Sequence, residues 1–143
     1  MHLDPSALSI LHAIFGMALL TLIMAGWMSV ARQIAMGRTG VRLQQAAHTR
    51  DLATLLPSSA QRVADNYNHL MEAPTVFYAV ALAIIAGGIA DPLYADCAWA
   101  FLFCRILHSL VQATFNRVSL RAGLYGLSWI ALAIMIVRSV LRF

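Results

Sequence analysis

The chain has 143 residues, of which 61% are hydrophobic and 11% are charged, with a formal net charge of +4. Soluble domains carry roughly 25% charged residues, so this composition excludes an ordinary soluble globular protein. All ten basic residues are arginines, and most lie beside apolar segments, where membrane topology explains them better than a nucleic-acid surface does. We therefore expect a lipid bilayer around the chain and no nucleic-acid partner.

Four apolar segments are each close to the roughly 20 residues that cross a bilayer as a helix. They cover about residues 6–32, 60–88, 94–115 and 122–140. Pro5 and Ser6 suit the start of the first helix. Its apolar run exceeds that of a typical signal peptide and no basic residue precedes it, so we expect a retained span. Because Ser29-Val30-Ala31 loosely resembles a cleavage site, a cleaved signal peptide stays open as an alternative. The predicted fold is an all-α integral membrane bundle of four transmembrane helices in a single domain, residues 1–143.

The loop at about residues 33–59 is long, polar and rich in arginine. Seven arginines lie at or in the first and third loops, and two lie on the opposite side. The seven are Arg32, Arg38, Arg42, Arg50, Arg62, Arg117 and Arg121, and the two are Arg138 and Arg142. Because arginine-rich loops tend to stay cytoplasmic, we expect a multi-pass protein of the cell membrane with a cytoplasmic first loop and both termini outside.

In three of the spans, polar residues fall on one stripe of the helix surface when successive residues are placed about 100° apart around the axis. The stripes hold Arg62, Asp65, His69 and Glu72, with Asn66 at the edge and Asn68 just beyond, then Arg105, His108, Gln112 and Asn116, and then Arg121, Tyr125 and Ser128. Ionisable groups at membrane depth normally face the bundle interior or a cavity and have a partner. The excess of arginine over carboxylate indicates an anionic ligand, because the guanidinium fork fits carboxylates.

Each polar residue also has a structural interpretation. Glu72 and Arg105 are candidates for an ion pair between helices with nothing bound. His108 is a candidate for a hydrogen bond to a backbone carbonyl. Arg117 and Arg121 suit interfacial anchors that reach lipid phosphates. The sequence leaves these alternatives open, and we assign no metal ligands.

Two motifs resemble those of a known family. The stretch RILHSLVQATFNRVSLRAGLY, from Arg105 to Tyr125, has Arg-x-x-His, then twelve residues, then Arg-x-x-x-Tyr. The stretch RVADNYNHLMEAP has an arginine ahead of Asn, Glu and Pro. With four spans and a long basic first loop, the chain resembles the MAPEG family, membrane-associated proteins in eicosanoid and glutathione metabolism. Its motifs look most like those of the branch with microsomal prostaglandin E synthase.

The resemblance implies a homotrimer that binds glutathione between subunits on the cytoplasmic side. The glutathione-binding residues that it implies are Arg32, Arg62, Asn68, His69, Glu72, Arg105, His108 and Tyr125. Arg121 matches the arginine credited with activating the glutathione thiol, and Glu72 would meet the ammonium group of the peptide or hold an arginine. The chain departs from the family pattern at Asp65, where an arginine is frequent, at His69 instead of Asn, and at Gln112 instead of Tyr. Its proline also follows Glu72 by only two residues.

The leading hypothesis is a membrane enzyme, similar to a glutathione transferase or peroxidase, that uses glutathione or a similar thiol as cosubstrate on small lipophilic electrophiles. One alternative is a small four-span transporter with Glu72 as its coupling carboxylate. Another is a non-catalytic binding or scaffold protein of the same fold. A haem protein with His69 and His108 as paired ligands is the remaining alternative.

Overall fold

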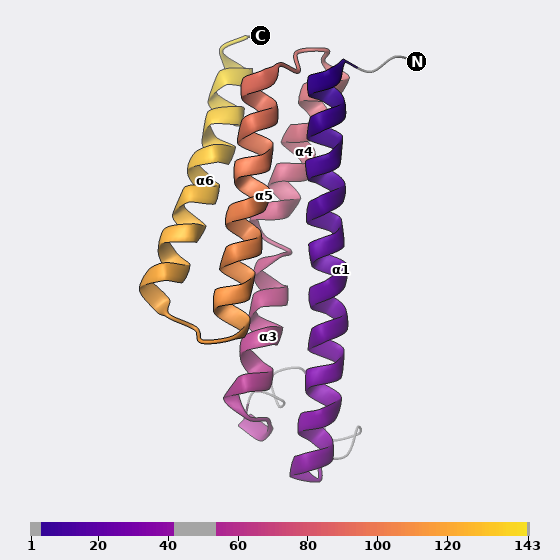
Figure 1. Cartoon of the computed structure of the whole chain (residues 1–143), viewed down its shortest axis with the longest axis vertical. Helices are drawn as coiled ribbons and strands as arrows, with labels where there is room; N and C mark the ends of the chain where they lie inside the picture. Colours follow the sequence, from indigo (N-terminus) through magenta and orange to yellow (C-terminus); the bar gives the residue numbers. More distant parts are fainter. Residues whose placement is uncertain (1–3, 42–53, 143) are drawn as a thin grey trace.

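The computed structural model describes residues 4–41 and 54–142 of the chain. The helices are α1 (Pro5–Thr39), α3 (Ser58–His69), α4 (Ala73–Ala86), α5 (Pro92–Ala113) and α6 (Val118–Val140). They stand side by side in one elongated bundle, with the two termini at the same end (Figure 1). Among the described residues, four helical segments are long and apolar enough to cross a membrane, and α3 and α4 together form the second of them. The predicted all-helical, four-span architecture is therefore confirmed, whereas the trimer stays a prediction.

Local sequence explains where α1 begins and ends. The Asp4 carboxylate accepts a 3.0 Å hydrogen bond from the Ser6 amide, and Pro5 occupies the first turn, where its missing N–H is harmless. The helix ends at Gly40, which adopts the left-handed conformation with φ 70°. At about 1.5 Å per residue, the 35 residues of α1 exceed the hydrocarbon core of about 30 Å. The helix thus continues beyond Arg32, where the predicted span ended.

The second span is interrupted, which the sequence-based prediction of a single helix did not include. Residues 70–72 form a turn between α3 and α4, visible as a change of course between the two ribbons (Figure 1). Pro74 explains the interruption, because proline lacks the N–H that would bond the carbonyl of Leu70 and its ring conflicts with that carbonyl. The turn brings His69 and Glu72 to the interrupted middle of the span.

α5 is the most buried of the spans and packs against α6, α1 and α3. Phe101 of α5 stacks on Phe77 of α4 with 4.4 Å between ring centroids. α1 approaches closely at Gly16, where an added Cβ would lie 2.6 Å from Cδ2 of Leu102. These contacts make α5 the central helix and fix the depth of its polar residues relative to α3 and α4.

Large apolar side chains face outward on the long helices. Examples are Phe15, Leu22 and Val30 on α1 and Ile130 and Val137 on α6, all exposed on the chain. In water such a surface would favour aggregation. Contact with lipid explains it, in agreement with the length and hydropathy of the spans.

Candidate functional site

The interruption of the second span is tied to α5 by Arg105. Its Nη2 donates a 2.7 Å hydrogen bond to the backbone carbonyl of His69. That carbonyl lies in the last turn of α3, where carbonyls lack regular partners within the helix. Arg105 therefore reaches across the helix interface and satisfies the end of α3 in the middle of the membrane span.

The remaining donors of Arg105 are not used. The residue is fully buried, and within residues 4–41 and 54–142 its Nε and Nη1 have no hydrogen-bond partner. Its guanidinium carbon lies 5.6 Å from the centroid of the Tyr125 ring on α6, within the range of a cation–π contact. The structure pairs Glu72 with His69, and the alternative of an ion pair between Glu72 and Arg105 is not formed in the single chain.

Further unsatisfied polar atoms lie at the same interface. The amide of Asn66 and the hydroxyl of Ser109 are fully buried and have no partner among the described residues. Asn66 lies one turn before His69 on α3, and Ser109 lies one turn after Arg105 on α5. Because the two helices run in opposite directions, these turns lie at similar depth, so the interface contains a polar layer with unused hydrogen-bonding capacity.

His69 and Glu72 form a pair at the interruption itself. Nδ1 of His69 lies 3.1 Å from Oε2 of Glu72, and the two side chains are 38% and 55% exposed. The His69 ring meets the rings of His108 and Tyr125 edge-on, with centroid separations of 6.2 and 6.4 Å. We call His69, Glu72, Arg105, His108 and Tyr125 the central polar cluster. It unites the stripes predicted for three spans.

His108 is buried, and both of its ring nitrogens have partners. Nδ1 donates to the backbone carbonyl of Arg121 at 3.0 Å, and Nε2 lies 2.9 Å from Oε1 of Gln112. The bond to Arg121 holds the first turns of α6 against α5, as the structural interpretation of His108 anticipated. Since neither nitrogen is free, this arrangement does not support the haem alternative with His69 and His108 as ligands.

A model of the MAPEG family matches residues 10–141. The chain belongs to the MAPEG family. The comparisons with curated proteins and with solved structures give no match. Membership confirms the predicted family and, with the four apolar helices, a multi-pass membrane protein related in general to glutathione and eicosanoid metabolism. The match is to the family as a whole, so the prostaglandin E synthase branch stays a prediction.

Within the MAPEG fold, the other predicted site residues lie outside the cluster in the single chain. Arg62 donates from Nη1 to the carbonyl of Thr114 at 2.8 Å, joining α3 to the end of α5. The guanidinium of Arg121 donates to Oδ1 of Asn116 at 2.9 Å in the loop before α6. Arg32 is half-buried on α1 and Asn68 is exposed on α3, and neither has a described contact with the central polar cluster.

The structure shows what the residues that depart from the MAPEG pattern contact. Gln112, in place of the tyrosine, bonds Nε2 of the buried His108. His69, in place of the asparagine, pairs with Glu72. Asp65 is exposed, so the charge change at this position does not enter the cluster of the single chain.

A second charged group, which the sequence analysis missed, lies at the end of the bundle that carries the termini. Asp91 accepts 2.6 Å hydrogen bonds from Arg138 and Arg142, and both guanidinium groups lie over the Tyr94 ring. The hydrogen bond from Arg138 is the main cause that lowers the pKa of the Asp91 carboxyl to about 2. No local pattern identifies this clamp, because its members are far apart in the sequence.

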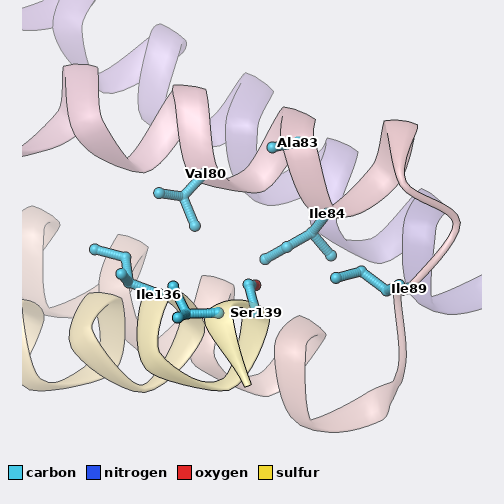
Figure 2. A pocket seen from close by; sticks show the side chains of 7 residues that line it. Val80, Ala83, Ile84, Ile89, Ile136 and Ser139 are labelled. Atoms are coloured by element: carbon cyan, nitrogen blue, oxygen red, sulfur yellow. The ribbon is translucent and has the colours of Figure 1, made fainter. Parts of the chain in front are cut away.

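Near this clamp, a groove of about 210 Å³ lies between α4 and α6. Figure 2 shows its lining of aliphatic side chains, among them Val80, Ile84 and Ile136, with the hydroxyl of Ser139 as the one labelled polar group. That hydroxyl donates to the carbonyl of Met135 at 2.8 Å. The groove therefore suits hydrocarbon and offers no charged group for recognition.

Proposed function

We propose that this MAPEG protein is a membrane enzyme that uses glutathione, or a similar thiol, to attack lipophilic electrophiles or to reduce lipid hydroperoxides. The observation that carries the proposal is the fully buried guanidinium of Arg105, with Nε and Nη1 unpartnered among the described residues. A buried cation that no carboxylate contacts directly is costly. A carboxylate of glutathione matches the guanidinium fork and would remove that cost.

The cluster supplies complementary groups for the rest of such a peptide. Glu72 is more than half exposed and suits the ammonium group. Tyr125 and His69 are half-buried beside Arg105, and we expect their rings to turn aside when the ligand carboxylate reaches the guanidinium. His108 positions α6 through the Arg121 carbonyl.

We propose that Arg121 stabilises the thiolate. We propose that Arg32, Arg62 and Asn68, which lie outside the central polar cluster, also contact the bound glutathione. In the single chain the Arg121 guanidinium is held by Asn116, and an anionic ligand would compete for the same donors. We further propose that the protein forms a homotrimer whose neighbouring subunits complete the site on the cytoplasmic side. This arrangement would bring together residues that the single chain leaves apart.

The proposed reaction depends on the positive charge of the arginines, which favours the thiolate form of the bound thiol. A free thiol has a pKa of about 8.5, and a neighbouring cation favours its thiolate, which is the nucleophile. The thiolate sulfur attacks an electrophilic carbon of the lipid-soluble substrate, a sulfur–carbon bond forms and the leaving group departs with its electron pair. A site at membrane depth receives the lipophilic substrate from the bilayer.

Titration calorimetry of glutathione into the detergent-solubilised protein tests the proposal. We expect saturable binding that Arg105→Ala abolishes and that Arg117→Ala retains, because Arg117 is exposed at the start of α6. Arg121→Ala should bind glutathione but lose most of the conjugation rate. A folded wild-type protein that does not bind glutathione, or an Arg121→Ala variant with unchanged activity, would contradict the proposal.

A second candidate function is proton-coupled transport, favoured by the carboxylate of Glu72 at an interrupted span. Transporters place their binding sites at such interruptions, and Glu72 is exposed there. Uptake into proteoliposomes that depends on a proton gradient and is abolished by Glu72→Gln would favour this function. The same variant should retain part of the conjugation activity if the enzyme proposal is right.

A further inference from the structure

His69 occupies the position where the family pattern has asparagine, and it differs from asparagine in one chemical respect. An imidazole accepts and releases a proton near neutral pH, whereas an amide does not. The site therefore contains a proton acceptor that the family pattern does not supply. The residues around His69 determine which ring nitrogen can accept a proton.

The Glu72 carboxylate fixes the tautomer of His69. Because a carboxylate accepts hydrogen bonds, Nδ1 at 3.1 Å from Oε2 carries the proton, and Nε2 presents its lone pair. Among the described residues Nε2 has no hydrogen-bond partner, and the side chain is 38% exposed. A histidine oriented by a carboxylate, with its second nitrogen accessible, is the arrangement of a general base.

The other groups that face His69 come from α5 and α6. On α5, the Arg105 guanidinium bonds the His69 carbonyl, and the His108 ring lies 6.2 Å away between centroids. On α6, the Tyr125 ring lies 6.4 Å away. No described ion pair or hydrogen bond joins His69 to a charged side chain of α1.

We propose that His69 is the catalytic base that removes the proton from the bound thiol, with Glu72 as its positioning residue. This inference rests on the proposed function, because it requires a thiol in the central polar cluster. In the step, the S–H bond of glutathione breaks and its proton goes to Nε2. The sulfur electron pair forms the bond to the electrophilic carbon, and the leaving group takes the electrons of the bond that breaks. The imidazolium then returns its proton to solvent, while Arg121 stabilises the thiolate charge.

The dependence of kcat/KM on pH for glutathione conjugation to 1-chloro-2,4-dinitrobenzene tests this role. In the wild type we expect the rate to fall as the pH is lowered, because a protonated imidazole cannot accept the thiol proton. His69→Gln keeps polar hydrogen-bonding atoms but cannot serve as a base. It should lower the rate near neutral pH by about 10²-fold or more, in the range of general base catalysis. The loss should shrink at high pH, where glutathione ionises without assistance.

Matched controls separate this role from charge and from folding. His12→Gln removes an exposed histidine of α1, and Asp65→Asn removes an exposed carboxylate of α3; both should retain the wild-type profile. Glu72→Gln should reduce the rate by roughly tenfold, because the orienting carboxylate is lost while His69 remains. The backbone bond from Arg105 does not use the His69 side chain, so we expect His69→Gln to fold.

Glutathione binding distinguishes the possible failures. If His69→Gln binds glutathione and keeps the wild-type rate and pH profile, His69 is not the base, although the proposed function stands. If His69→Gln lowers the rate by the same factor at every pH, His69 has a structural role and the inference is overturned. If the wild type does not bind glutathione, the proposed function fails and the inference fails with it.

Discussion

The Arg105 guanidinium donates a 2.7 Å hydrogen bond to the backbone carbonyl of His69. This contact joins the middle of α5 to the end of α3 and sets the depth at which the polar stripes of the spans meet. It also explains why a cation is tolerated in an apolar span, because one donor is satisfied by the chain. The donors that remain are the basis for the first prediction.

Arg105→Met should leave the thermal stability of the ligand-free protein unchanged or raise it. The substitution leaves the His69 carbonyl without a strong partner, at a cost of about 1–3 kcal/mol. It also removes a buried cation whose effective desolvation penalty is several kcal/mol. Thermal unfolding in detergent, followed by circular dichroism, measures the balance. Added glutathione should raise the melting temperature of the wild type and not that of the variant. A marked loss of stability in Arg105→Met would identify Arg105 as chiefly a structural cap.

The Asp91 clamp should make stability depend on pH in the acid range. The pKa of Asp91 is lowered to about 2 in the folded protein, against about 3.9 for an unfolded aspartate. A lowered pKa contributes stability that is present above the unfolded value and is lost as the pH falls toward the folded value. The free energy of unfolding of the wild type should therefore approach that of Asp91→Asn between about pH 4 and pH 2. Parallel curves for the two proteins across this range would contradict the prediction.

Gly16→Ala should be destabilising alone and stabilising in the background of Leu102→Ala. A Cβ at Gly16 would lie 2.6 Å from Cδ2 of Leu102, so the leucine must move from a packed position. Overpacking costs about 1–3 kcal/mol, whereas alanine is favoured over glycine in a helix by about 1 kcal/mol. A double-mutant cycle of unfolding free energies measures the coupling. Additive effects would show that Leu102 moves aside at no cost.

Pro74→Ala should partly restore the continuous helix of the second span and weaken glutathione binding. Alanine supplies the N–H that proline lacks, so the turn at residues 70–72 loses its cause. In a continuous helix the N–H of Ala73 would bond the His69 carbonyl and compete with Arg105, which donates a 2.7 Å bond to that carbonyl in the native turn. We expect lower glutathione affinity by calorimetry without a loss of thermal stability. Wild-type affinity in this variant would show that the site does not need the interruption.

The sequence predicts the parts of the structure that depend on runs of apolar residues and on the helical periodicity of polar residues. Long apolar runs locate the four spans, and helical periodicity places Arg105 and His108 on one buried face of α5. It also aligns His69 and Glu72, which form a pair in the structure. These features follow from one helix at a time, so an isolated sequence is sufficient to find them.

The features that were missed depend on how helices lie relative to each other. Pro74 is present in the sequence, but the sequence-based prediction does not include the interruption that it causes in the second span. It also does not include the pairing of Glu72 with His69. The sequence suggests a topology role for the charge of Arg138, whereas in the structure Arg138 binds Asp91 across the bundle. The family resemblance predicts the Arg121 side chain at the site, whereas in the single chain this side chain bonds Asn116. Periodicity gives the face and the depth of a side chain, but the choice of partner depends on neighbouring helices.

The interruption of the second span also separates two helix dipoles inside the membrane. A helix carries a partial negative charge at its C-terminus and a partial positive charge at its N-terminus, so the two ends that meet at this turn have opposite polarity. Arg105 binds at the end of α3, and Glu72 is the N-cap of α4. Each charged side chain therefore has a helix end of opposite sign beside it. The cation and the carboxylate are both stabilised without joining each other, so two nitrogens of the buried guanidinium keep donors that the described residues do not use.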